Sequence, residues 1–120
     1  MLIKSGSELN DFCIDIDSSI TDAMFQIEKN CKRGALVINK ENEVVGVITD
    51  GDIRRSLIRG VFQNTLIKDV LNSNFKYIEK QPNNDLQASL TKLFNKYNEL
   101  EIVPVVNKSM KLISLGIRRS

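Results

Sequence analysis

The sequence contains no histidine and no tryptophan, and only two cysteines and two prolines among its 120 residues. Without histidine, the chain lacks the commonest general base, the Ser-His and Cys-His nucleophile pairs, and any mixed Cys/His zinc cluster. Aromatic residues make up 6% of the chain and the net charge is only +2. These values argue against base-stacking platforms and against an electrostatic nucleic-acid binder. We therefore expect no nucleic-acid partner.

Long apolar runs are also missing. Met1–Glu8 lacks the apolar core of a signal peptide, and no run approaches the length that crosses a bilayer. The expectation is a cytosolic (cytoplasmic) protein with no membrane partner. In a reducing compartment, and without a dense cysteine framework, Cys13 and Cys31 are expected to be free, mostly buried thiols. A metal or redox pair is disfavoured.

The composition is that of an ordinary globular domain, with 42% hydrophobic and 27% charged residues. This length suffices to bury a core, so one compact unit is expected. The first sixty residues combine period-two and helical patterns. An apolar stripe from Ile20 to Ile27 has helical spacing, and Ser18 or Ser19 can cap the start of this helix. Gly34 is expected to turn the chain out at the end of the helix. The predicted elements are an extended segment over 12–17, a helix from 20 that ends within 29–34, strands over 35–38 and 44–48, and a helix over 52–59.

The second half of the chain aligns with the first. Val106-Asn107-Lys108 matches Ile38-Asn39-Lys40, and the same gapless register aligns Leu112-Ile113 with Val44-Val45. A tandem repeat is the economical description, with units over 1–62 and 63–120. The further predicted elements are a short bridging helix over 65–71, a short strand over 75–78, a turn over 82–84 and a helix from 85. The apolar stripe of this last helix matches the stripe at 20–27 after a two-residue shift and consists of Leu86, Leu90, Leu93, Phe94 and Tyr97.

The most informative stretch is Val44–Gly60, in which a buried strand enters the turn Thr49-Asp50-Gly51-Asp52 and a helix follows. Such a junction directs backbone N–H groups and the positive end of the helix dipole at one spot, the usual place for a phosphate. This geometry favours a nucleotide site. The alternative is structural, with Asp50 or Asp52 only capping the helix and Thr49 only satisfying the turn.

Gly46, Thr49 and Asp52 also carry a resemblance: a β-hairpin ending in Gly, two apolar residues, Thr, two variable positions and Asp is similar to that of CBS domains. A tandem pair forms the Bateman module. The implied fold class is α/β (α+β), with two β-α-β-β-α repeats whose small sheets pack against helices in a pseudo-two-fold arrangement. The resemblance implies that Asp52 holds ribose hydroxyls, that Thr49 contacts phosphate, and that the base lies near Ile14 to Ile16 and near Gly34 to Leu36. The ligand expected is an adenine nucleotide (AMP, ADP or ATP), bound by Thr49, Asp50, Asp52, Arg54, Ile14, Ile16, Ala35 and Leu36.

The second repeat departs from this motif. In the gapless register Ser114 replaces Gly46, Ile117 replaces Thr49, and Ser120 takes the place of Asp52. We therefore expect a single, asymmetric site on the first repeat. The chain also stops where the last helix of the second repeat is expected to begin, within 116–120, so we expect either the N-terminal module of a larger protein or a curtailed repeat.

The sequence Thr-Asp-Gly-Asp-Ile-Arg-Arg is similar to that of Bateman modules attached to bacterial sugar-nucleotide enzymes, especially those at the N-terminus of nucleotidyltransferases. The resemblance implies a regulatory module, not an enzyme, that forms a homodimer through its helices and acts on an attached or partner catalytic domain.

Two alternatives to this function stay open. Asp50 with Asp52 could form an acid/base or magnesium pair, which is disfavoured at a helix start, or the module could be a structural dimerisation unit without ligand. Arg54 and Arg55 fit a phosphate clamp, a partner contact or a solvated face.

Overall fold

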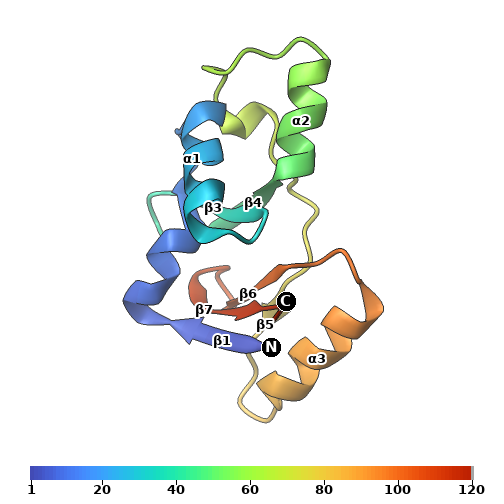
Figure 1. The fold of residues 1–120 in the computed structure, drawn as a ribbon. Coiled ribbons are helices and arrows are strands. Elements are labelled where there is room, and N and C mark those ends of the chain that lie inside the picture. The colour runs from blue at the N-terminus through green and yellow to red at the C-terminus, as the bar shows by residue number, and fades with distance from the viewer. Residues whose placement is uncertain (120) are drawn as a thin grey trace.

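The computed structural model describes residues 1–119 and consists of two small sheets, each with its own helices (Figure 1). One sheet has the strand order β2-β3-β4 and the other has the order β1-β7-β6-β5. This is a small mixed α+β architecture, as the sequence predicts. The elements are β1 (Leu2–Ser5), the 3-10 helix η1 (Gly6–Phe12), β2 (Cys13–Asp15), α1 (Ile20–Asn30), β3 (Gly34–Ile38), β4 (Val44–Thr49), α2 (Asp50–Ile58), the 3-10 helix η2 (Ile67–Asp69), β5 (Ile78–Glu79), α3 (Leu86–Lys96), β6 (Ile102–Val106) and β7 (Leu112–Ile117).

The three-stranded sheet carries α1 and α2. Strand β2 runs parallel to β3, and β3 pairs with β4 in an antiparallel hairpin. Helix α1 begins at the predicted cap, because the Asp22 N–H donates to Ser19 Oγ and the Ser19 N–H donates to the Asp22 carboxylate. Its inner face is buried against the strands, and the core of this unit consists of Ile14, Ile20, Ala23, Ile27, Ala35, Val37, Ile48, Ile53 and Ile67.

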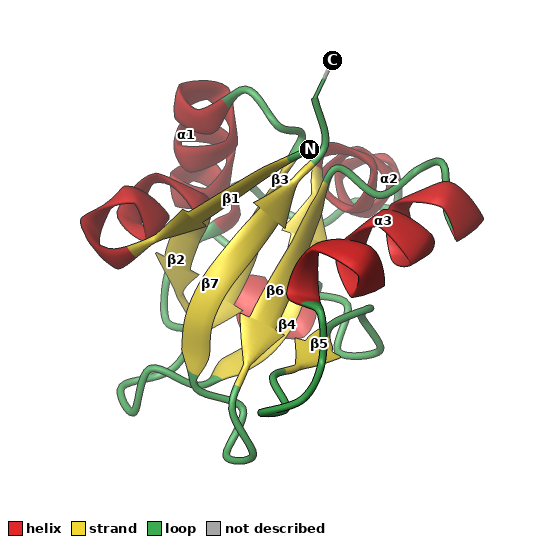
Figure 2. Ribbon diagram, turned by 90° about the horizontal axis from the view of Figure 1, so that it is seen from below, coloured by secondary structure: helices red, strands yellow, loops and turns green. Residues whose placement is uncertain are grey.

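The four-stranded sheet takes its strands from both ends of the chain. Strand β1 pairs antiparallel with β7, which pairs with β6, and β6 runs parallel to β5. Helix α3 lies across one face of this sheet (Figure 2), where Leu90 and Phe94 pack on Val103 and Val105. The sequence analysis assigned no structure to the first eleven residues, so β1 and nearly all of η1 are additions. The first residues of the chain complete the sheet of the second repeat.

The gapless register between the repeats is confirmed by the strand pairing. Gly46 lies opposite Val37 in the first hairpin, and Ser114 lies opposite Val105 in the second. Each hairpin has a β-bulge directly after this pair. A bulge at the same place in both hairpins is the signature of a structural repeat. Ser114 and Ile117 therefore occupy the positions that the alignment gave them, whereas Ser120 lies outside the described residues.

The hairpin turns meet each other at equivalent residues. The Val44 N–H donates to the Met110 carbonyl at 2.8 Å, and the Leu112 N–H donates to the Asn42 carbonyl at 3.2 Å. Between these bonds, Glu43 and Lys111 form an isolated antiparallel bridge. This reciprocal pattern is what a two-fold relation between the repeats requires. Deeper in the interface the two sheets share one core, made of Leu9, Phe12, Leu36, Ile102, Leu115 and Ile117.

Several predictions were wrong in detail. Gly34 does not turn the chain out of α1, because Cys31 and Arg33 have the positive φ values of 60° and 64° and Gly34 is already in β3. The predicted strand over 75–78 begins only at Ile78. The predicted helix over 116–120 is absent from the described residues, since β7 continues to Ile117.

The two cysteines have different environments. Both are free thiols, but only Cys13 is shielded, and burial raises its pKa to about 11. Cys31 is exposed, so the prediction that it is buried was wrong. Across residues 1–119, every helix is too short or too polar to span a bilayer.

Candidate functional site

A cavity of about 740 Å³ opens where the two repeats meet beside the start of α2. The first repeat contributes the segment before β3 and the β4–α2 junction, and the second contributes the segment between α3 and β6. Segments distant in sequence thus face each other across what we call the inter-repeat cavity. It is lined by Lys32, Arg33, Gly34, Val47, Thr49, Asp50, Gly51, Arg54, Arg55, Asn98, Glu99, Leu100, Glu101 and Ile102.

Charges are unevenly distributed around the inter-repeat cavity. All four cationic side chains come from the first repeat, namely Lys32, Arg33, Arg54 and Arg55. The second repeat contributes the carboxylates of Glu99 and Glu101. Within residues 1–119, Arg33 and Arg54 form no ion pair, so their guanidinium groups are available to an anion. One wall of the cavity therefore favours phosphate or carboxylate.

The β4–α2 junction forms a complete capping box. The Asp52 N–H donates to Thr49 Oγ1 at 3.1 Å, and the Thr49 N–H donates to Asp52 Oδ2 at 3.0 Å. The structural alternative placed the cap on Asp50 or Asp52, whereas in the structure Thr49 is the N-cap and Asp52 completes the box. Thr49 lines the inter-repeat cavity, while Asp52 lies beside it and is not one of the lining residues.

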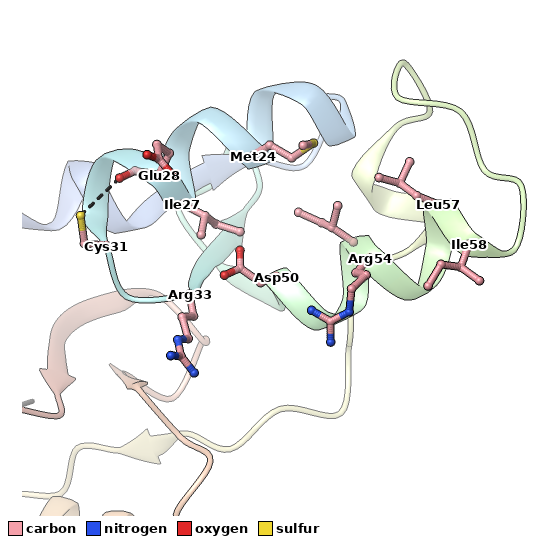
Figure 3. A pocket seen from close by; sticks show the side chains of 10 residues that line it. Met24, Ile27, Glu28, Cys31, Arg33, Asp50, Arg54, Leu57 and Ile58 are labelled. Carbon is pink, nitrogen blue, oxygen red and sulfur yellow. Dashed lines mark hydrogen bonds between the residues drawn. The ribbon is translucent and has the colours of Figure 1, made fainter.

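A second cavity, a groove of about 700 Å³ between α1 and α2, shares a wall with the first. Arg33, Asp50 and Arg54 line both. Figure 3 shows Asp50 directed into the groove, whereas Arg33 and Arg54 point away from α1. The groove is otherwise largely apolar, with Met24, Ile27, Ile53, Leu57 and Ile58 on its walls. It lacks the concentration of cations that distinguishes the inter-repeat cavity, so we consider the latter the candidate ligand site.

Of the residues that the resemblance placed near the base, Gly34 lines the inter-repeat cavity, whereas Ile14, Ile16, Ala35 and Leu36 are not among its lining residues. Ala35 and Leu36 are fully buried in β3, and Ile14 is 8% exposed. Ile16 is half-buried and packs on the core of the first repeat. Of the eight predicted residues, the structure thus brings Thr49, Asp50 and Arg54 together at the cavity. The role of the other five in binding stays a prediction.

The sequence analysis missed Lys32, Arg33 and the segment over 98–101. A signal for the last was available, because in the repeat register this segment corresponds to the residues before Gly34. Arg33 has a further structural mark: a non-glycine residue at φ 64° is uncommon and costs about 1 kcal/mol or more. Such an outlier at a cavity wall is typical of a functional position.

At the corresponding position of the second repeat, Arg118 turns onto the end of α3, and the cavity that it lines there is smaller, about 260 Å³. Its guanidinium donates to the carbonyl oxygens of Leu100 at 2.6 Å, Phe94 at 2.7 Å and Tyr97 at 3.0 Å. These carbonyls belong to the end of α3 and the segment after it. Arg118 therefore satisfies backbone acceptors that a helix end leaves unpaired.

Comparisons with known proteins agree with this architecture. The family model described as "CBS domain" matches residues 8–59. The solved CBS domains of a transcriptional regulator from Streptococcus pneumoniae superpose with a TM-score of 0.75 at 24% identity, covering 98% of this chain and 90% of that chain. The fold is that of a CBS domain pair.

The CBS pair of protein MJ0100, solved in complex with 5′-methylthioadenosine and S-adenosyl-L-methionine, has a TM-score of 0.69 at 19% identity and covers 88% of this chain and 80% of that chain. An uncharacterised Helicobacter pylori protein is 41% identical over 44 residues, which are 37% of this chain. The match spans only 13% of that relative's length.

Proposed function

We propose that this CBS domain pair is a nucleotide-sensing module that binds an adenine nucleotide (AMP, ADP or ATP) in the inter-repeat cavity. The observation that carries the proposal is the concentration of four cationic side chains in a cavity of about 740 Å³ at the Thr49–Asp52 junction. Small-molecule sites commonly occupy about 300–1,000 Å³. The size and the charge of the cavity thus suit a phosphorylated nucleoside.

In this arrangement the phosphates face Arg33 and Arg54, which have no carboxylate partner within residues 1–119. Guanidinium groups bind phosphate through paired N–H donors. The ribose lies toward Asp52, whose carboxylate is a natural acceptor for a cis-diol. The adenosine-containing ligands of the MJ0100 complex support this class of ligand.

The regulatory part of the proposal is a homodimer formed through the helices of the first repeat. Large apolar side chains are exposed on these helices and just after α2: Met24 is 43% exposed, Phe25 73%, Ile58 77% and Phe62 76%. A second copy would remove them from water. Because Arg33, Asp50 and Arg54 line both the inter-repeat cavity and the α1–α2 groove, a nucleotide that moves them also changes the surface offered to the second copy. The regulated activity belongs to an attached or partner catalytic domain. The sequence of residues 49–55 favours a sugar-phosphate nucleotidyltransferase as that domain.

Calorimetric titration with AMP, ADP, ATP and GTP tests the nucleotide site. The native protein should bind at least one adenine nucleotide, and Arg54→Ala should weaken that binding about tenfold or more, because a hydrogen bond to a charged group contributes about 1.5–3 kcal/mol. Arg59→Ala is the matched control, since Arg59 is the C-cap residue of the same helix and lies outside the cavity lining. Equal affinity of all three proteins would reject the site.

A structural dimerisation module without ligand is the second candidate. It is favoured by the same exposed apolar residues and by the capping box, which already engages Thr49 and Asp52. Absence of binding to every nucleotide, together with a dimer in sedimentation equilibrium, would support it over the nucleotide sensor. A Phe25→Ser variant should then dissociate the dimer.

A further inference from the structure

Asp52 already has partners on both carboxylate oxygens, although the proposed function assigns it the ribose. Oδ2 accepts the Thr49 N–H at 3.0 Å, and Oδ1 accepts Arg55 Nη2 at 2.9 Å. The first bond belongs to the helix cap, while the second is a salt bridge between side chains. Each carboxylate oxygen can accept a second hydrogen bond, but Arg55 lines the inter-repeat cavity and Asp52 does not, so the guanidinium shields Oδ1 from the cavity.

The Arg55 side chain is folded back over the first turn of α2. A Cβ atom placed on Gly51 would lie only 3.0–3.5 Å from three guanidinium atoms of Arg55. Both residues line the inter-repeat cavity, so the guanidinium lies between Asp52 and the space that a ligand would enter. The positive charge of Arg55 is thus held near the N-terminal turn of α2, where the positive end of the helix dipole disfavours cations.

The salt bridge that holds Arg55 there is weak. The Arg55 side chain is 56% exposed and that of Asp52 is 23% exposed, and pairs this accessible to water add little stability. An incoming phosphate group offers Arg55 a stronger partner, since it provides two or more anionic acceptors and matches the helix dipole that Arg55 opposes. A phosphate therefore competes well for the guanidinium.

We propose that Arg55 is a latch on the nucleotide site: on binding, its guanidinium leaves Asp52 Oδ1 for a phosphate of the ligand, and the freed Oδ1 accepts a ribose hydroxyl. The Thr49 capping box keeps Oδ2 in place throughout. This inference rests on the proposed function and adds a selection rule to it. A nucleoside without phosphate must break the salt bridge with no compensation, so the latch selects phosphorylated nucleosides against free ones.

Calorimetry with adenosine and with ADP on the native protein and on Arg55→Met tests the latch. Methionine keeps an apolar stem over Gly51 but removes the charge. Adenosine should bind Arg55→Met about 1.5- to 5-fold more tightly than the native protein, the range expected for an exposed ion pair. ADP should bind it about tenfold more weakly, because a charged contact to phosphate is lost. A residue with a merely structural role would change both affinities in the same direction.

Arg59→Met, which changes a cation outside the cavity lining of the same helix, should leave both affinities unchanged. Parallel weakening of adenosine and ADP in Arg55→Met would overturn the latch while leaving the nucleotide site intact. Unchanged affinities would overturn it as well, as would failure of adenosine to bind Arg55→Met when ADP binds the native protein. If no ligand binds any of the proteins, the proposed function itself fails and the latch with it.

Discussion

The two repeats make the same backbone contact after their second hairpin strand but use the side chain at that point differently. In the first repeat the Asp50 N–H donates to the Arg33 carbonyl at 2.9 Å, and in the second the Arg118 N–H donates to the Glu101 carbonyl at 2.9 Å. Asp50 then starts α2 and lines an open cavity. Arg118 instead folds back onto the end of α3. At this repeated position, the aspartate of the first repeat lines the inter-repeat cavity, whereas the arginine of the second repeat binds the end of α3.

The ends of the preceding helices explain the difference. Both helices end with the same backbone bond, from the Cys31 N–H to the Ile27 carbonyl and from the Tyr97 N–H to the Leu93 carbonyl, but Cys31 has the left-handed conformation of a local helix cap. Helix α3 ends at Tyr97 in an extended conformation. Its last carbonyls need a donor from elsewhere, and Arg118 is that donor. A locally capped helix leaves its neighbourhood free for a ligand, whereas an open end recruits a side chain.

The largest expected effect comes from removing that donor. Arg118→Met should lower the free energy of unfolding by about 2–4 kcal/mol, because three carbonyl acceptors lose a charged donor at once. Urea denaturation followed by circular dichroism measures the change. Arg54→Met, at the open site, should change stability by less than about 0.5 kcal/mol, since surface residues without such partners rarely contribute more. Equal losses in the two variants would remove the distinction between the two positions.

A smaller effect is expected from replacing Gly46, the motif residue for which the second repeat has Ser114. This substitution tests why the first repeat has glycine there. A Cβ on Gly46 would lie 2.6 Å from Leu71 Cδ1 and 3.0 Å from the Asn72 carbonyl oxygen. The linker between the repeats pairs with β4 here through Asn72 and Val47. Gly46→Ala should therefore destabilise the protein by about 1–3 kcal/mol, the usual cost of overpacking, in the same urea experiment.

Gly51→Ala is the matched control for this prediction. Its Cβ would approach the Arg55 guanidinium at 3.0 Å, but that is the far end of an exposed side chain and can move away. Stability should change by less than about 0.5 kcal/mol. Should Gly51→Ala prove as costly as Gly46→Ala, backbone conformation rather than the linker contact would be the reason for the glycine.

Much of this comparison was predictable from sequence because it depends on local patterns. The β-branched strands, the Ser19–Asp22 cap and the gapless repeat register all follow from short-range spacing, and the structure confirms them. The pairing of β1 with β7 was not predictable in this way. Leu2–Ser5 carries no period-two signal, and the partner strand lies at the other end of the chain.

The site was predicted less well than the fold. Thr49, Asp50 and Arg54 were found because a strand–turn–helix junction places them together by its own geometry. Arg55 stands three residues after Asp52, and this helical spacing permits an ion pair, but only side-chain orientation shows that the pair faces the cavity. The side chains of Ala35 and Leu36, which the resemblance assigned to the ligand, are buried in β3, and their role in binding stays a prediction.

The smallest effect concerns the residue that ends α3. The ammonium groups of Lys76 and Lys96 lie 4.7 and 5.4 Å from the centre of the Tyr97 ring and lower the pKa of its hydroxyl, Lys76 having the larger influence. Lys76→Ala should raise the Tyr97 pKa toward its ordinary value, which ultraviolet titration against a Tyr97→Phe reference resolves. Lys92→Ala, an exposed change on the same helix, should not. An unchanged Tyr97 pKa in Lys76→Ala would mean that the Lys76 ammonium does not lie over the Tyr97 ring in solution.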